Sequence, residues 1–247
     1  MAAAMARGWA ASERGPDGMV FVDSGSGRAL DLAAELGEQR VAEVAELAER
    51  ADLIVLAVKP KALDEVAPAI AGRVDAVISV LGATPLERLH EALGDTPVLR
   101  TMPNLAVEVR RGVISHTPVE RAEDVLGDAL DLLGKLGTTV EVAESDLDAA
   151  TAVMGCAGAY LAKACEALVD AGVEAGLDPE LSQKLVREMA AGTGEHLLTL
   201  PPAEMHAAIA SPGGSTEAGL EALEAAGAME GFKAAVHASL ERMAGVR

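Results

Sequence analysis

The chain has 247 residues, a formal net charge of −19 and a pI near 4.6. This charge excludes broad contact with nucleic acid or an anionic membrane, because both need clusters of lysine and arginine. Aromatic residues make up only 2% of the chain, so stacking platforms for bases are scarce. We therefore expect a small molecule as the ligand.

The cysteines and the hydropathy pattern restrict the class of protein further. Cys156 and Cys165 form no CxxC motif and no Cys/His cluster, which predicts neither a zinc site nor a disulfide framework. The sequence shows no signal peptide and no uninterrupted apolar run of the roughly 18 residues that a membrane span needs. We expect a reduced, soluble, cytoplasmic protein without a metal site.

Short β-rich segments alternate with helical segments from Met19 to about Glu141. The expected strands are 19–23, a short piece around Arg40, 52–58, 76–81, 98–102, 112–116 and 138–142. Such alternation is typical of an α/β fold, a parallel sheet with helices on both faces. The apolar run from Leu53 to Val58 predicts a central strand that is buried on both faces.

From Asp146 onward the pattern is helical. The segment 146–176 predicts a long apolar helix that Gly176 ends, and Asp178-Pro179 begins the next helix, which Pro201-Pro202 breaks. A helix as apolar as the first is normally buried on all sides, so we predict a homodimer through it. The expected domains are 1–143 and 144–247.

The sequence Ser-Pro-Gly-Gly-Ser-Thr at 211–216 predicts a turn followed by a helix that starts near Ser215 or Thr216. Backbone amides from Gly213 to Thr216 can converge on an anion at the positive end of this helix, and a carboxylate has the right size. An ordinary turn with Thr216 as the helix cap explains the same residues about equally well.

Several motifs occur in a characteristic order. A nucleotide-binding half contains LAVKP at 56–60 and RTMPN at 100–104, and SPGGSTEAGLEALE follows at 211–224. In this order they resemble the pyrroline-5-carboxylate reductase family over essentially the whole chain, and the last motif is the specific one. The resemblance implies a Rossmann-like doubly wound domain followed by an all-α dimerisation domain. It also implies reduction of 1-pyrroline-5-carboxylate to proline with NADPH or NADH, the last step of proline biosynthesis.

The resemblance also assigns residues to the cofactor. It places Ala57, Val58, Lys59 and Pro60 along the dinucleotide, just past the carboxyl end of a strand, and Asn104 near the nicotinamide. A solvated surface charge is the alternative for Lys59. A turn-forming role is the alternative for Asn104.

At the adenine end the signals conflict. Asp23 ends the second strand of the nucleotide fold, where a carboxylate takes the ribose hydroxyls of NADH. Ser24, Ser26 and Arg28 follow and suit a 2′-phosphate, so we favour NADPH slightly.

For the substrate, the resemblance assigns the loop at 211–216. Ser211, Gly213, Gly214, Ser215 and Thr216 are expected to hold the substrate carboxylate. The imine nitrogen must be protonated to accept hydride readily, and Thr216 is the expected catalytic residue there. Its hydroxyl pKa suits a relay or orienting role rather than that of a strong acid.

The chain departs from the family pattern at three places, one of which is Leu105-Ala106, where the family often has Thr-Pro after MPN. MAAAMARGWA at 1–10 matches the first helix of the family, so we expect that the preceding strand and glycine loop have been lost by an internal start and that cofactor binding is weakened. MGCAGAY stands at 154–160 where the family has a Ser-Gly-Ser-Gly-Pro-Ala-Tyr type of helix start. Gly155, Gly158 and Ala159 remain candidates for a pocket wall, and we expect Cys156 to be a small buried residue rather than a nucleophile.

Two alternatives stay open. One is a related imine or hydroxyacid reductase of the 6-phosphogluconate-dehydrogenase-like group, in which Lys163 would stand near the catalytic lysine without the rest of the pattern. The other is a non-catalytic dimeric scaffold that has lost cofactor binding.

Overall fold

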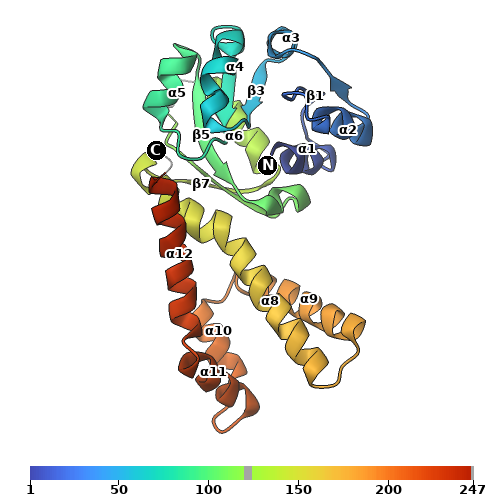
Figure 1. The fold of residues 1–247 in the computed structure, drawn as a ribbon, viewed down its shortest axis with the longest axis vertical. Coiled ribbons are helices and arrows are strands. Elements are labelled where there is room, and N and C mark those ends of the chain that lie inside the picture. The colour runs from blue at the N-terminus through green and yellow to red at the C-terminus, as the bar shows by residue number, and fades with distance from the viewer. Residues whose placement is uncertain (120–123, 246–247) are drawn as a thin grey trace. The chain divides into compact units, whose positions relative to one another are not determined.

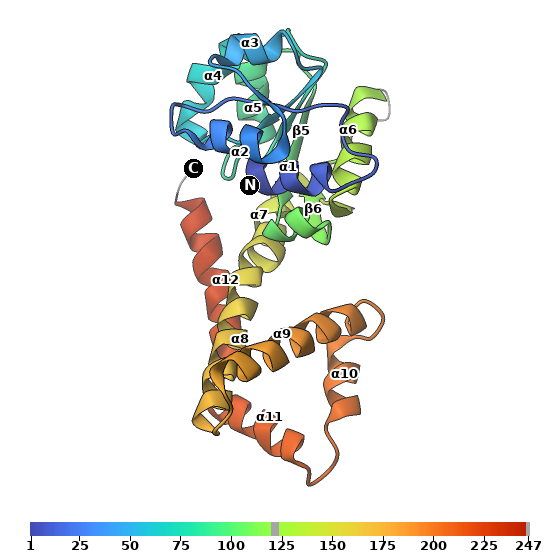
Figure 2. The same cartoon turned by 90° about the vertical axis from the view of Figure 1, so that its right-hand side faces the viewer.

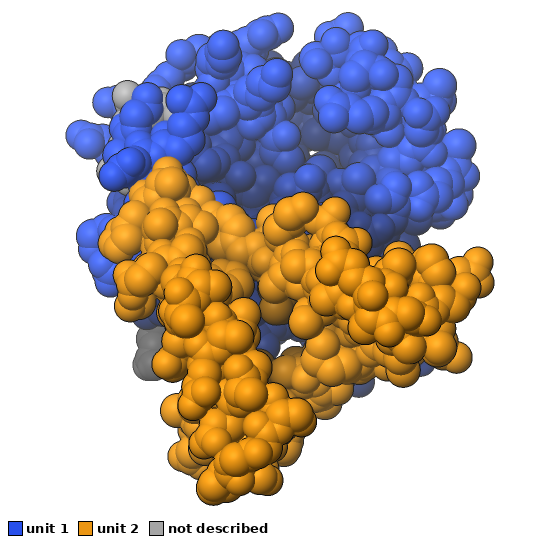
Figure 3. All heavy atoms as spheres, turned by 60° about the horizontal axis from the view of Figure 1, so that its bottom comes forward, with its two compact units in different colours: residues 1–156, 240–247 blue, residues 157–239 orange. Residues whose placement is uncertain are grey.

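The computed structural model describes residues 1–119 and 124–245 (Figure 1). The chain forms two compact units, coloured separately in Figure 3. Unit 1 is Met1–Cys156 with Leu240–Arg247, and unit 2 is Ala157–Ser239. The units divide at 156/157, because the first turns of the long helix pack on the sheet of unit 1.

Among the described residues, unit 1 contains seven strands in two sheets. A two-stranded parallel sheet pairs β1 (Val20–Phe21) with β2 (Gln39–Arg40). A five-stranded sheet follows in the order β3 (Leu53–Leu56), β4 (Ala76–Ser79), β5 (Val98–Pro103), β6 (Gly112–His116) and β7 (Gly137–Glu141). The parallel pairing confirms the predicted α/β, Rossmann-like fold.

One pair of neighbouring strands, β5 and β6, is antiparallel. Only the short 3₁₀ helix η2 (Leu105–Val109) separates these strands, and a parallel return needs a crossover of a dozen or more residues.

Helices cover both faces of the larger sheet (Figure 1). They are α1 (Ala2–Ala10), α2 (Arg28–Leu36), α3 (Val44–Ala48), η1 (Pro60–Ala62), α4 (Leu63–Ile70), α5 (Leu86–Leu93), α6 (Asp124–Gly134), η3 (Glu144–Asp146) and α7 (Leu147–Ala150). One apolar cluster joins residues of α3, α4 and α5 to β3, and a second joins α1 and α6 to β4 and β5. In the second cluster Met5 is fully buried, and the indole Nε1 of Trp9 donates to the Leu132 carbonyl at 2.8 Å. The two clusters fix the sheet edge where ligands bind in such folds.

The two sheets of unit 1 are separated between β1 and β3. Both strands line a cavity of about 680 Å³, together with Ala2, Ala6 and Trp9 of α1. In the part of the chain that the structure describes, β3 is therefore an edge strand, and its Leu53 and Val55 are only half-buried. The prediction of a central strand at 53–58 is wrong, because no strand pairs with β3 on the side facing β1.

Unit 2 is helical, as predicted (Figure 2). It contains α8 (Ala157–Glu174), α9 (Pro179–His196), α10 (Pro202–Ile209), α11 (Ser215–Ala225) and most of α12 (Ala228–Ala244). The Asp178 carboxylate caps α9 by accepting from the amides of Glu180 and Leu181 at 3.0 and 3.1 Å. Gly176 adopts a φ of 98°, which ends the preceding helix. The predicted end at Gly176 and the predicted start at Asp178-Pro179 are confirmed, whereas α9 ends at His196, ahead of Pro201-Pro202.

Unit 2 has almost no core of its own. Only Ser182 and Met205 are buried among residues 157–239. Exposed large apolar side chains are spread over its helices: Leu161, Leu168, Val173, Leu177, Leu181, Leu185, Met189, Leu197, Leu198, Ile209, Leu223, Met229 and Phe232. So much exposed apolar surface indicates that another surface covers it.

The continuous helical run Glu144–Glu174 is long and apolar enough to cross a membrane by length and composition, and 6% of its most apolar window is buried. Lys163 and Glu166 interrupt its apolar residues, so the sequence contains no uninterrupted apolar run at this place. Core helices of soluble oligomers pass the same test.

Candidate active site

Four of the residues predicted to bind the cofactor lie together where β3 ends. Ala57, Val58 and Lys59 form the turn after the strand, and Pro60 begins η1. Ala57, Lys59 and Pro60 are exposed, and Val58 is half-buried. The turn therefore presents a backbone stretch and one cation at the carboxyl edge of the parallel strands.

The loop after β1 is organised by the carboxylate of Asp23. One oxygen accepts from the Gly25 amide at 2.8 Å, and the other accepts from the Ala29 amide at 2.7 Å and the Ser26 hydroxyl at 3.0 Å. The hydrogen bond from Ala29, followed by those from Gly25 and Ser26, lowers the pKa of Asp23 to about 2. Asp23 thus caps α2, and its own loop occupies both of its oxygens.

Ser24 and Arg28 are exposed on the same loop. The Arg28 Nε donates to the Ser26 hydroxyl at 3.1 Å, and Gly27 precedes α2 with a φ of 81°. The loop therefore carries an accessible guanidinium and an accessible hydroxyl beside a helix start, a combination that suits a phosphate.

Asn104, which follows β5, is engaged by the protein. Its Oδ1 accepts from the Val113 amide of β6 at 3.1 Å, and its Nδ2 donates to the Met154 carbonyl at 3.1 Å. Met154 belongs to a π-helical turn, η4 (Thr151–Cys156), which continues into α8. Both ends of the amide that was expected near the cofactor are therefore bonded within unit 1.

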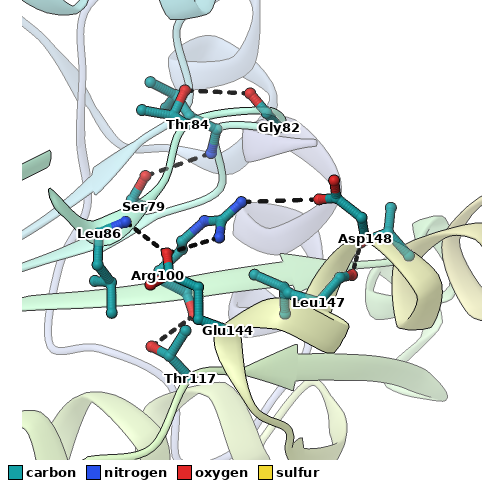
Figure 4. Close-up of polar contacts among 11 residues, drawn as sticks. Ser79, Gly82, Thr84, Leu86, Arg100, Thr117, Glu144, Leu147 and Asp148 are labelled. Carbon is teal, nitrogen blue, oxygen red and sulfur yellow. Dashed lines mark hydrogen bonds and ion pairs between the residues drawn. The ribbon is translucent and has the colours of Figure 1, made fainter. Parts of the chain in front are cut away.

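Sequence reasoning gave no role to Arg100, whose side chain is 2% exposed in the middle of β5 (Figure 4). Its Nη1 donates to Glu144 Oε1 at 2.9 Å, and Nη2 lies 3.9 Å from Asp148 Oδ1. The same Glu144 oxygen accepts from the Leu86 amide at 2.6 Å. The buried Arg100 Nε has no hydrogen-bond partner among the described residues. An arginine inside an apolar strand needs a carboxylate partner, so its position in VLRTM was the available signal.

The small residues after Met154 lie on a partly accessible surface. Gly155 and Cys156 are half-buried in η4, and Gly158 and Ala159 are exposed in α8. The prediction that Cys156 is buried is therefore wrong. Inside the turn the Thr151 hydroxyl donates to the Leu147 carbonyl at 2.6 Å.

The loop at 211–216 leads into α11, as expected. The helix starts at Ser215 with Gly214 as its N-cap. The Gly214 amide donates to the Ser211 carbonyl at 2.9 Å, and a Cβ on Gly214 would lie 2.8 Å from that oxygen. Gly213 has a φ of 72°, which favours glycine. Thr216 is half-buried in the first turn.

One amide of this loop already holds a carboxylate. The Gly213 amide donates to Glu217 Oε2 at 2.7 Å. Sequence reasoning missed Glu217, although a glutamate three residues after a helix cap was a usable signal. The contact places a carboxylate oxygen where the loop was expected to receive one.

The predicted site residues thus form two groups, one on each unit: residues 24–104 on unit 1 and residues 211–216 on unit 2. Over residues 1–119 and 124–245 there is no group of three or more His, Cys, Asp or Glu side chains that would hold a metal ion. Lys163, considered for a hydroxyacid reductase, is 79% exposed and ion-paired with Glu166, which raises the pKa of Lys163.

Two family models match the chain. Residues 144–246 match the family described as pyrroline-5-carboxylate reductase dimerisation. Residues 1–82 match the family described as NADP oxidoreductase, coenzyme F420-dependent.

Relatives and solved structures cover most of the chain. The pyrroline-5-carboxylate reductase of Corynebacterium melassecola is 31% identical over 97% of this chain and 92% of its own length. That of Synechocystis sp. is 35% identical over 80% and 76%. The structure of 1-pyrroline-5-carboxylate reductase from Streptococcus pyogenes has a TM-score of 0.86, 26% identity and coverage of 98% and 94%.

A further solved structure carries a nucleotide. Plasmodium falciparum pyrroline carboxylate reductase with NADP bound has a TM-score of 0.83 and 28% identity, covering 97% of this chain and 92% of that chain. Sequence, helical-domain and structural similarity thus agree over nearly the whole length. The chain belongs to the pyrroline-5-carboxylate reductase family.

Proposed function

We propose that this chain reduces 1-pyrroline-5-carboxylate to L-proline with NADPH or NADH, as the last step of proline biosynthesis. The observation that carries the proposal is the loop at 211–216, where the amide of Gly213 donates to a carboxylate oxygen, that of Glu217, at 2.7 Å. The similarity to relatives that bear the reductase name over 97% of this chain supports it.

The proposed cofactor residues lie on loops that follow strands of unit 1. They are Ser24 and Arg28 after β1, Ala57, Val58, Lys59 and Pro60 after β3, and Asn104 after β5. The exposed cations Arg28 and Lys59 suit the phosphates of a dinucleotide in a chain whose net charge is −19. We favour NADPH, because Ser24 and Arg28 remain accessible while Asp23 is occupied by its own loop.

The proposed substrate residues are Ser211, Gly213, Gly214, Ser215 and Thr216, which hold the carboxylate at the positive end of α11. A bound nicotinamide supplies a hydride to the imine carbon. Thr216 orients the proton at the imine nitrogen, and the loop keeps the ring in place while the C=N bond becomes C–N.

We propose a homodimer and a cytoplasmic location for this chain. Residues 144–247 form the dimerisation and substrate-binding domain of a homodimer, and residues 1–143 form the cofactor domain. Few residues of unit 2 are buried and many of its apolar side chains are exposed, which supports an interface with the same unit of a second copy. A reduced cytoplasmic location agrees with the unpaired Cys156 and Cys165.

The test is substrate-dependent oxidation of NADPH and NADH by the purified chain, with Thr216→Val and Ser24→Ala as variants. We expect turnover with pyrroline-5-carboxylate and a loss of kcat in Thr216→Val of about 10- to 1,000-fold, as for other groups that assist proton transfer or orient the substrate. Ser24→Ala is expected to weaken the binding of NADPH more than the binding of NADH. Turnover of hydroxyacids without turnover of the imine would contradict the proposal.

A further inference from the structure

The side chain of Asn104 joins two elements that are far apart in sequence. The Val113 backbone N–H of β6 is a donor and therefore faces Oδ1, at 3.1 Å. The Met154 carbonyl is an acceptor and therefore faces Nδ2, at 3.1 Å. These two partners fix the orientation of the amide, and the Asn104 backbone N–H adds a third bond, to the Val113 carbonyl at 3.1 Å.

The element that Asn104 holds is an unusual one. The turn η4 is π-helical over Thr151–Cys156, and such turns are rare and occur frequently at functional sites. A π-turn shifts the register of the helix and changes which residues face outward. Here Val153 is 60% exposed, and Gly155 and Cys156 are half-buried, so the outer face of η4 is accessible.

A side chain of β5, the strand that precedes Asn104, attaches the helix upstream of η4. Arg100 of β5 is bonded to Glu144 at 2.9 Å and lies 3.9 Å from Asp148 (Figure 4). Arg100 binds Glu144 at the start of the helical run, and Asn104 binds Met154 further along it. The helix is therefore attached both before and after Thr151. The π-turn is thus attached to unit 1 ahead of its first residue, through Arg100, and within the turn itself, through Asn104.

We infer that Asn104 is a positioning residue for the reduction: it fixes the π-turn η4 through the Met154 carbonyl, and the accessible face of η4 forms a wall of the reaction site beyond β5. The inference rests on the proposed function for the site itself. Both Oδ1 and Nδ2 of Asn104 are hydrogen-bonded to the protein, so the contribution of Asn104 to the cofactor site is indirect. This indirect role replaces, for Asn104 alone, the direct cofactor contact proposed above.

The first test variant is Asn104→Asp, which has the same shape. It keeps an acceptor for the Val113 amide but removes the donor to Met154 and opposes its carbonyl with a negative charge. We expect hydrogen–deuterium exchange of peptides covering 151–158 to accelerate about tenfold or more, with little change in the remaining sheet. Ser115→Ala is the matched control, because the Ser115 hydroxyl of β6 donates to the Met102 carbonyl of β5 at 3.4 Å, within the sheet.

The second variant, Asn104→Ala, separates positioning from direct cofactor binding without adding charge. We expect its NADPH dissociation constant, measured by fluorescence titration, to stay within about twofold of the wild type. Its kcat for pyrroline-5-carboxylate should fall about tenfold or more, since misplacing a site wall by about an ångström can cost this much.

The opposite pattern overturns the inference: normal exchange at 151–158 with NADPH binding weakened tenfold means a direct cofactor contact. Faster exchange throughout unit 1 means general destabilisation and also overturns it. If the wild-type chain lacks the proposed activity, the exchange and NADPH measurements still decide whether Asn104 holds η4.

Discussion

The carboxylates of Asp23 and Glu217 accept from backbone amides at the start of a helix. Asp23 accepts from Gly25 ahead of α2 and from Ala29 in the first turn of α2, and Glu217 accepts from Gly213 ahead of α11. In both loops a glycine with positive φ turns the backbone so that its amides face outward. The capacity to bind a carboxylate is therefore built into the backbone of these loops and does not require a basic side chain.

Glu217 is expected to compete with the substrate. A carboxylate at a helix N-terminus is worth about 0.3–1 kcal/mol, so neutralising it in Glu217→Gln should lower the KM for pyrroline-5-carboxylate by roughly two- to fivefold. Steady-state kinetics measure this, with Glu221→Gln one turn further along α11 as the control. An unchanged or higher KM in Glu217→Gln would show that Glu217 does not compete with the substrate.

The buried Arg100 cluster should respond asymmetrically to substitution. Glu144→Ala leaves a buried guanidinium without its nearest partner and should lower the free energy of unfolding by ~3 kcal/mol. Arg100→Met leaves two carboxylates that solvent reaches, since Glu144 and Asp148 are 37% and 17% exposed, and should cost less, ~1–2 kcal/mol. Urea unfolding of both variants measures the difference. Equal losses would contradict this account of the cluster.

The role of a residue could be predicted from local sequence where its bonding partners are close in the chain, and could not be predicted where they are distant in the chain. The glycine turn and the start of α11 at Ser215 followed from neighbouring residues. The bond from Asn104 to Met154 spans 50 positions and had no local signal. For that reason the role of Asn104 emerged only from the packed structure, whereas the position of Arg100 in an apolar strand was a signal that was not used.

At the scale of elements, helix ends and strand positions were predictable because their causes are local. Asp178 and Pro179 begin α9, and the β-rich runs became β1 to β7. Pairing was less predictable, because an apolar run looks the same whether a strand lies at the centre or at the edge of a sheet. The edge position of β3 and the antiparallel return of β6 depend on their neighbours.

The cap of α2 should titrate at unusually low pH. The folded pKa of Asp23, about 2, lies below the value of about 4 for an unfolded chain, so its stabilising effect is present above pH ~4 and is lost as the pH falls toward 2. NMR titration of the Asp23 carboxyl carbon should give a midpoint near 2. Ser26→Ala removes one donor and should raise this midpoint, and an ordinary midpoint in the wild type would refute the capping account.

At the scale of the whole molecule, the acidic charge and the exposed apolar helices have opposite effects on association. A net charge of −19 opposes non-specific association, whereas the apolar side chains of unit 2 favour one specific partner surface. A family match described as dimerisation over residues 144–246 agrees with a second copy as that partner. Folding of unit 2 and assembly are then expected to be a single process.

Assembly should be sensitive to charge on α8. Leu168 is 51% exposed, and Leu168→Glu is expected to give monomers by size-exclusion chromatography with light scattering. Lys163→Glu introduces the same carboxylate at a position that is already polar and 79% exposed, and this variant should remain dimeric. The thermal midpoint of the wild type should also rise with protein concentration. A concentration-independent midpoint would argue against coupled folding and assembly.

The separation of β1 from β3 has a consequence for the cooperativity of unfolding. No strand pairing in the described residues links the β1–α2–β2 segment to the five-stranded sheet, and a cavity of about 680 Å³ lies between them. We expect this segment to open as a separate low-stability folding unit while β4, whose residues are all buried, stays closed. In native-state hydrogen exchange, amides of residues 20–40 should therefore exchange by sub-global opening, well before those of residues 76–79.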